Sequence, residues 1–158
     1  MQEIVDNSYT CVLGNSPYLD NNTLIISPKV KVASIVEDEF DERDLTKALK
    51  NNFQDNMILE FENNGEFVEK AMNISSSFDK VIVYSYDAYK DDVQKEVINK
   101  LLKLNKEIYV VSIKGPIDQK CFSGLVNYSC VYEYTPNSIR TIIKQLKNQI
   151  TLNGKLPK

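Results

Sequence analysis

Apolar residues in this chain follow two alternating patterns, one typical of buried strands and the other typical of helices. Three continuous runs rich in Val and Ile indicate strands of a parallel sheet that is covered on both faces. These runs are residues 23–27, 81–84 and 108–113. The segment 91–105 instead carries an apolar stripe at helical spacing, which predicts a helix. The stripe consists of Val93, Val97, Leu101 and Leu104, widened by Ile98 and Leu102.

Weaker signals of the same two kinds occupy much of the remaining chain. Gly115-Pro116 ends the strand 108–113, and Thr135 followed by Pro136 is typical of a helix start. The acidic stretch 37–44 is expected to form a solvated loop. We expect further strands at 10–13, 56–61 and within 127–134, and further helices at 45–53, 66–78, 118–125 and from 136 onward.

Alternation of strand and helix predicts an α/β fold. Right-handed crossovers between parallel strands place helices on both faces of the sheet. We therefore predict a three-layer sandwich with a mostly parallel, flavodoxin-like sheet. One domain is expected over 1–158, with an N-terminal arm and junction segment at 1–22, the sheet and helices at 23–150 and a tail at 151–158.

Ligands of such sheets bind beyond the carboxyl ends of the strands. We expect this rim to carry Ser27, Glu60, Ser85, Tyr86, Asp87, Lys114, Gly115, Glu133 and Tyr134. The candidates for substrate contact among them are Ser85, Tyr86, Asp87, Lys114, Glu133 and Tyr134.

Two of these assignments have a structural alternative. Asp87 is either a rim carboxylate or a helix-capping or loop aspartate, and the second interpretation is favoured. The tyrosines of the second half either form a sugar-stacking surface or, as we favour, fill the edge of the core with the hydroxyl in water. They are Tyr84, Tyr86, Tyr89, Tyr109, Tyr128, Tyr132 and Tyr134.

Composition excludes several classes of function. The chain has 158 residues, a formal charge of −3 and interleaved acidic and basic residues, which argues against a nucleic-acid partner. No apolar run approaches the roughly 20 residues of a membrane span, so no membrane contact is expected from this chain, and its first residues do not have the pattern of a signal peptide. The chain has no histidine, which removes Ser-His-Asp and Cys-His catalysis. The three cysteines are expected to be buried thiols.

Motifs for cofactors are missing from the sequence. There is no GxGxxG after a strand and no GxxxxGK[ST], and flavin mononucleotide would need a Ser/Thr/Gly-rich loop after the first strand. We therefore expect no cofactor and no metal. A phospho-receiver domain shares the fold class, and Asp87 and Lys114 match two of its positions. The strand 23–27 is nevertheless followed by Pro28 where a receiver needs an acidic pair for magnesium.

The order of these segments resembles the C-terminal domain of family 3 glycoside hydrolases, above all the bacterial β-N-acetylhexosaminidase branch. Gly115-Pro116-Ile117-Asp118 stands where that branch has Asn-Pro-Tyr-Asp. The stretch 132–136 is similar to its tyrosine and proline segment, and 152–157 is similar to its Pro-Ser-Gly-Lys-Leu-Pro tail. The segment 8–15 resembles, more loosely, the run at the domain junction.

The resemblance implies a non-catalytic accessory domain that packs on a (β/α)8 catalytic barrel, in cis or in trans. The barrel carries the nucleophile aspartate and, in the hexosaminidase branch, an acid/base histidine, so no catalytic residue is carried over to this chain. The parent enzyme would be a carbohydrate-cleaving hydrolase, secreted or on the surface of a bacterium. The alternatives are a stand-alone saccharide-binding or dimerisation module and, third, a receiver-like signalling domain.

Overall fold

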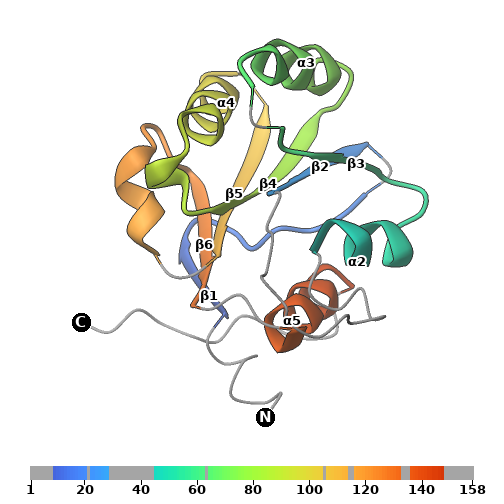
Figure 1. Cartoon of the computed structure of the whole chain (residues 1–158). Coiled ribbons are helices and arrows are strands. Elements are labelled where there is room, and N and C mark those ends of the chain that lie inside the picture. The colour runs from blue at the N-terminus through green and yellow to red at the C-terminus, as the bar shows by residue number, and fades with distance from the viewer. Residues whose placement is uncertain are drawn as a thin grey trace, which may run out of the picture.

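A six-stranded sheet in the order β1-β6-β5-β4-β2-β3 forms the centre of the computed structural model (Figure 1). The structure describes residues 9–20, 22–28, 45–62, 64–104, 106–113, 116–132 and 136–147. The strands are β1 (Tyr9–Leu13), β2 (Thr23–Ser27), β3 (Met57–Glu60), β4 (Lys80–Tyr86), β5 (Glu107–Ile113) and β6 (Asn127–Val131).

Five of the strands are parallel and make the predicted flavodoxin-like arrangement. The chain starts this part of the sheet at β2, adds β3 on one side and then β4, β5 and β6 on the other. This is the doubly wound order in which the direction of winding reverses next to the first parallel strand. The sixth strand, β1, pairs antiparallel with β6 and forms an edge of the sheet. The antiparallel edge was not predicted, although a strand at 10–13 was.

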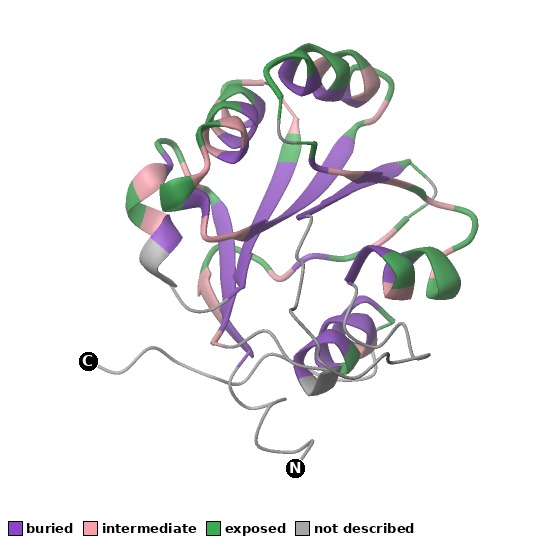
Figure 2. Ribbon diagram, in the orientation of Figure 1, coloured by how far each residue is buried: buried purple, intermediate pink, exposed green. Residues whose placement is uncertain are grey.

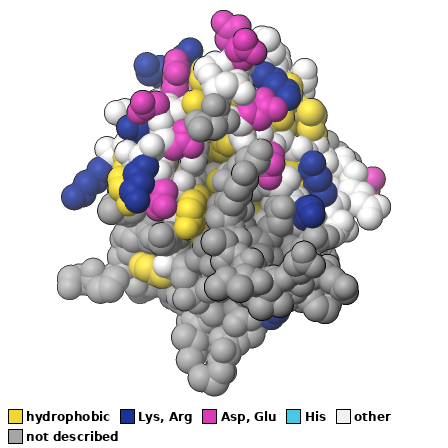
Figure 3. All heavy atoms as spheres, viewed as in Figure 1, with side chains coloured by type: hydrophobic (Ala, Val, Ile, Leu, Met, Phe, Trp, Pro, Cys, Tyr) yellow, Lys and Arg dark blue, Asp and Glu magenta, His cyan; other side chains and the backbone are white. Residues whose placement is uncertain are grey.

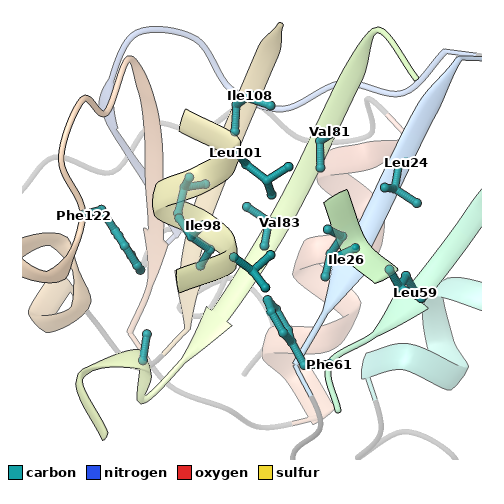
Figure 4. Close-up of a cluster of buried hydrophobic side chains, with 14 of the residues drawn as sticks. Leu24, Ile26, Leu59, Phe61, Val81, Val83, Ile98, Leu101, Ile108 and Phe122 are labelled. Atoms are coloured by element: carbon teal, nitrogen blue, oxygen red, sulfur yellow. The ribbon is translucent and has the colours of Figure 1, made fainter. Parts of the chain in front are cut away.

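Helices cover both faces of the sheet, as predicted (Figure 1). One face carries α3 (Glu66–Ser75) and α4 (Asp92–Leu102), and the other carries α2 (Leu45–Asn52) and α5 (Pro136–Leu146). The strands β2, β4, β5 and β6 are almost wholly buried, whereas β1 and β3 at the two edges are only partly buried (Figure 2). Figure 4 shows part of the hydrophobic cluster between the sheet and the helices α3 and α4, in which Ile98 and Leu101 of α4 pack against Val83 of β4.

Several boundaries differ from the predicted ones. The strand predicted at 81–84 extends over Lys80–Tyr86, so that Ser85 lies inside it. The helix predicted at 91–105 is Asp92–Leu102, because Asp91 is its N-cap. The short helix predicted at 118–125 is instead the 3₁₀ segment η3 (Pro116–Cys121), and a second one, η2 (Ala88–Lys90), follows β4. Among the described helices, none is both long and apolar enough to cross a bilayer.

Candidate functional site

The carboxyl ends of β4 and β5 place a row of polar side chains at the rim of the sheet. The parallel register sets Ser85 opposite Ser112 and Tyr86 opposite Ile113. Because side chains at paired positions of parallel strands point to the same face, the two serines meet beneath η2 and η3. Their hydroxyl oxygens are 3.0 Å apart.

A buried hydrogen-bonded network extends from these serines to a carboxylate. The Tyr128 hydroxyl donates to Ser112 Oγ over 2.8 Å, and Ser85 Oγ donates to Asp118 Oδ2 over 3.1 Å. The other carboxylate oxygen of Asp118, Oδ1, accepts from the backbone N–H of Tyr89 at 3.3 Å. All four side chains, of Ser85, Ser112, Asp118 and Tyr128, are inaccessible to solvent. We call these four residues the Asp118 network.

Burial keeps the Tyr128 hydroxyl, at the far end of this network, a hydrogen-bond donor. It raises the pKa of the Tyr128 phenol well above its ordinary value, and the hydrogen bond to Ser112 offsets only part of that shift. The phenol is therefore protonated throughout the neutral range. The network is thus a set of donors that point toward the carboxylate.

The segment after β4 is shaped by a side chain of α4. Gln94 Oε1 accepts from the backbone N–H of Tyr86, and Gln94 Nε2 donates to the carbonyl of Tyr86, both at 3.0 Å. Asp87, the next residue, has a left-handed backbone conformation with φ of 50°, which aspartate tolerates better than most residues. The chain therefore turns sharply at Asp87 and then enters η2.

Asp91 is the capping aspartate of this region. Its Oδ1 accepts from the backbone N–H groups of Val93 and Gln94, at 3.0 and 3.3 Å, at the start of α4. Asp87 precedes η2 and makes no side-chain capping bond to it. In the structure, Asp87 is thus a loop residue and does not cap a helix through its side chain.

Replacing Asp91 with alanine should lower the free energy of unfolding by about 1 kcal/mol, the usual cost of losing an N-cap. Urea denaturation followed by circular dichroism measures this change. Asp92→Ala is the matched control, because Asp92 follows at the first helical position with a side chain that is 98% exposed. An equal loss in both variants would contradict the capping role.

The structure places the other expected rim residues as follows. Ser85 is buried in β4, Tyr86 is half-buried at its end, and Asp87 lies in the turn that follows. Ser27 is buried at the end of β2, where its Oγ accepts from Thr46 Oγ1 at 3.0 Å, and Glu60 is half-buried at the end of β3. Outside the described residues lie Lys114, Gly115, Glu133 and Tyr134.

Three of the seven tyrosines that were considered for sugar stacking belong to the core. Tyr84, Tyr109 and Tyr128 are buried, as the favoured interpretation expects, but the hydroxyls of Tyr84 and Tyr128 are buried as well and do not lie in water. Tyr86 and Tyr132 are half-buried. Tyr89 in η2 is 40% exposed. It is therefore the most exposed of these tyrosines among those that the structure describes.

The cysteines and the charged residues give no sign of a further centre. Cys130 is buried, and burial raises the pKa of its thiol to about 11, whereas Cys11 and Cys121 are half-buried. In the described part of the chain, no three residues of the types His, Cys, Asp and Glu come together as a possible metal site. Acidic and basic side chains intermingle over the described part of the face in Figure 3.

Three residues of this site were not singled out as site residues from the sequence: Ser112, Asp118 and Gln94. Asp118 was quoted as part of the Gly115-Pro116-Ile117-Asp118 turn, but nothing in that turn indicates burial. Ser112 lies in an apolar strand, and its pairing with Ser85 depends on the register of β4 and β5. Extending the predicted strand 81–84 by one residue and pairing residue 81 with residue 108 would have placed Ser85 beside Ser112.

Solved structures of several enzymes contain this fold. Over 99% of this chain and 31% of that chain, a glycoside hydrolase family 3 β-N-acetylglucosaminidase from Paenibacillus sp. str. FPU-7 superposes with a TM-score of 0.77 and 24% identity. The fold of this chain is that of part of a family 3 glycoside hydrolase. The expected resemblance to family 3 is therefore confirmed for the fold.

Two other solved structures show a similar likeness. A fungal multi-domain family 3 β-N-acetylglucosaminidase, which has a GCN5-related glucosamine N-acetyltransferase region, matches over 98% of this chain and 18% of that chain, with a TM-score of 0.72 and 21% identity. A β-glucoside phosphorylase, BglX, matches over 98% and 30%, with a TM-score of 0.60 and 15% identity. The chain thus spans less than a third of the length of each of these proteins. No family model and no curated protein matches it.

Proposed function

We propose that this chain is a non-catalytic accessory domain of a β-N-acetylhexosaminidase-like family 3 glycoside hydrolase, and that it packs on a separate (β/α)8 catalytic barrel. The observation that carries the proposal is the superposition of nearly the whole chain on about a third of a family 3 β-N-acetylglucosaminidase. The remaining two thirds of such an enzyme have room for a barrel, which needs about 250 residues.

The side chains at the rim support a role without catalysis. A retaining glycosidase needs a nucleophile and an acid/base group whose carboxyl groups lie about 5 Å apart. Asp118 is buried and accepts hydrogen bonds through both oxygens, and Asp91 caps α4. The chain also has no histidine that could serve as acid/base group.

The proposal is tested first with the chain alone. We expect no release of 4-nitrophenol from 4-nitrophenyl N-acetyl-β-glucosaminide above the rate in buffer. Asp87→Ala is the matched variant, because Asp87 is the carboxylate expected at the rim. Robust turnover by the chain that is lost in Asp87→Ala would contradict the proposal.

A second experiment tests for the barrel itself. We expect a barrel-coding region of family 3 in the genome, either in the same reading frame as this chain or in another gene. That barrel, produced separately and mixed with the chain, should form a one-to-one complex in analytical ultracentrifugation. A genome without such a barrel, or a barrel that does not associate with the chain, would contradict the proposal.

The alternatives receive less support from the described residues. Among the described tyrosines of the second half, saccharide stacking would depend mainly on Tyr89, since Tyr84, Tyr109 and Tyr128 are buried. Titration of the isolated chain with N-acetylglucosamine, followed by tyrosine fluorescence, should therefore give no saturable change. A receiver-like domain would need an acidic pair after β2, where the chain has Ser27 and Pro28. Labelling with a phosphoryl donor should accordingly give no phosphorylated chain.

A further inference from the structure

All the hydroxyl hydrogen bonds of the Asp118 network are donated in the same direction, from Tyr128 toward Asp118. Ser85 Oγ donates to Asp118 Oδ2, so the single hydroxyl hydrogen of Ser85 is used by Asp118. The bond between the two serines must then come from Ser112, and Ser112 in turn accepts from Tyr128. Each hydroxyl donates once and accepts at most once along the path from Tyr128 to Asp118. Such chains polarise their members and strengthen each bond.

We infer that Asp118 is the positioning residue of the rim, because it joins the segments that follow β4 and β5 into one unit. It lies in η3, after β5, and its two oxygens bind Ser85 in β4 and the backbone N–H of Tyr89 in η2. A movement of η2 relative to η3 would break a bond to a buried carboxylate. This is costly, because a buried acceptor oxygen would lose its donor without gaining water.

The direction of the network explains why an aspartate serves here better than an asparagine. An asparagine has one oxygen, so it can accept from Ser85 or from Tyr89. If it accepts from Tyr89, its NH₂ group faces Ser85 and the chain of hydroxyls must reverse. Reversal leaves the hydrogen of the buried Tyr128 hydroxyl without an acceptor. Asp118→Asn therefore loses part of the anchorage although its shape is unchanged.

The segments η2 and η3, which Asp118 joins, carry a partly exposed aromatic residue, Tyr89. Tyr89 is 40% exposed, while Ala88 before it is buried and Gln94 clamps Tyr86 on the other side of the turn. The backbone at the start of η2 is thus fixed, while the Tyr89 side chain that follows is partly exposed to solvent. This further role rests on the proposed function: the barrel would meet η2 and η3 as one preformed surface, at a lower entropic cost than two mobile loops.

Amide hydrogen exchange of the full chain, resolved by residue, tests the positioning role without any partner. In Asp118→Ala, the Tyr89 amide should exchange about tenfold faster or more, the effect of losing one hydrogen bond to a buried acceptor. The amide of Ser123 should be unchanged, because it donates to Asn99 Oδ1 in α4 and not to Asp118.

Tyr128→Phe is the matched control. It removes a buried hydroxyl from the same network but leaves both bonds of Asp118 in place, so Tyr89 exchange should stay within about twofold of the wild-type rate. An unchanged Tyr89 amide in Asp118→Ala, or equal acceleration in Tyr128→Phe, would overturn the inference. Asn99→Ala should show the opposite selectivity, with Ser123 accelerated and Tyr89 unchanged.

A second arm links the unit to the partner. Asp118→Ala should weaken association with the family 3 barrel about tenfold, whereas Tyr128→Phe should not weaken it measurably. If the wild-type chain does not bind the barrel, the proposed function fails, while the exchange data still decide the role of Asp118. If the barrel binds wild type and Asp118→Ala equally, the link between the unit and the partner is overturned.

Discussion

Replacing Gly14 with alanine should lower the free energy of unfolding by about 3 kcal/mol, among the larger effects of a single methyl group. Gly14 follows the edge strand β1 and has a φ of +61°. An added Cβ atom would lie 2.3 Å from the carbonyl oxygen of Val126 and 2.4 Å from Asn127 Oδ1. The first of these atoms belongs to the backbone and cannot rotate away, so the strands themselves would have to move.

The movement would affect the attachment of β1 to the sheet. Asn127 is the first residue of β6, and its Oδ1 accepts from the backbone N–H of Asn15 at 2.9 Å. Close to this point the pairing of β1 with β6 is irregular, between Cys11 and Leu13. Displacement of Gly14 would therefore loosen the end of β1, which the rest of the sheet holds on one side only.

Two other glycines make a control series. Gly124 has a φ of +85° but open space around its Cβ position, so Gly124→Ala should cost only the backbone term of about 1 kcal/mol. Gly65 has open space as well and a φ of −68°, so Gly65→Ala should be neutral or slightly stabilising. Urea denaturation gives all three values. A loss in Gly14→Ala no greater than in Gly124→Ala would show that the contact with Val126 is unimportant.

The parallel part of the fold could be predicted because each of its elements carries its own local signal. The run 81–84 has no polar position to suggest a solvent face, and the structure indeed buries β4 on both sides. The antiparallel edge could not be predicted, because nothing in the five residues of β1 specifies which strand they pair with or in which direction. Its pairing with β6 links segments more than a hundred residues apart, and the close approach at Gly14 depends on that pairing.

The position of the candidate site at the carboxyl edge of the sheet could be predicted, but the contacts between its side chains could not. The rim and Ser85, Tyr86 and Asp87 followed from the ends of the strands, since parallel strands share one carboxyl edge. The inward direction of Ser85 did not follow, because the predicted strand ended one residue before it. Nor did the burial of Asp118, because a charged residue in a turn normally faces water and only the tertiary structure brings it under η2.

Lys80→Met should lower the free energy of unfolding by about 2–3 kcal/mol, the range for a hydrogen-bonded charge removed from a buried place. Lys80 begins β4 and is only 3% exposed. Its Nζ atom donates to the carbonyl of Tyr18 and binds Asp20 Oδ2, both at 3.0 Å, and it lies 3.0 Å from the centre of the Tyr18 ring. These contacts fasten the connection between β1 and β2 to the amino edge of the sheet.

The matched control for Lys80 is the same substitution in a surface ion pair. Lys95 Nζ lies 3.1 Å from Asp92 Oδ1, and both groups are accessible to water. Exposed pairs of this kind contribute at most about 1 kcal/mol, so Lys95→Met should have a small effect. Equal losses in Lys80→Met and Lys95→Met would mean that the burial of Lys80 adds nothing to its contacts.

The pH dependence of stability distinguishes loss of the Lys80 charge from loss of packing. Hydrogen bonds from Thr23 and then from Lys80 lower the pKa of Asp20 to about 2, below the roughly 3.9 of an unfolded chain. The contribution of Asp20 is therefore complete above about pH 4 and disappears as the pH falls toward 2. In Lys80→Met the pKa of Asp20 in the folded state moves back up, although Thr23 still lowers it.

The difference in stability between wild type and Lys80→Met should accordingly be widest at neutral pH and become smaller between pH 4 and pH 2. Urea titrations at each pH measure this difference. A gap that stays constant over this range would mean that Lys80 acts through packing and its bond to Tyr18, without its charge being coupled to Asp20.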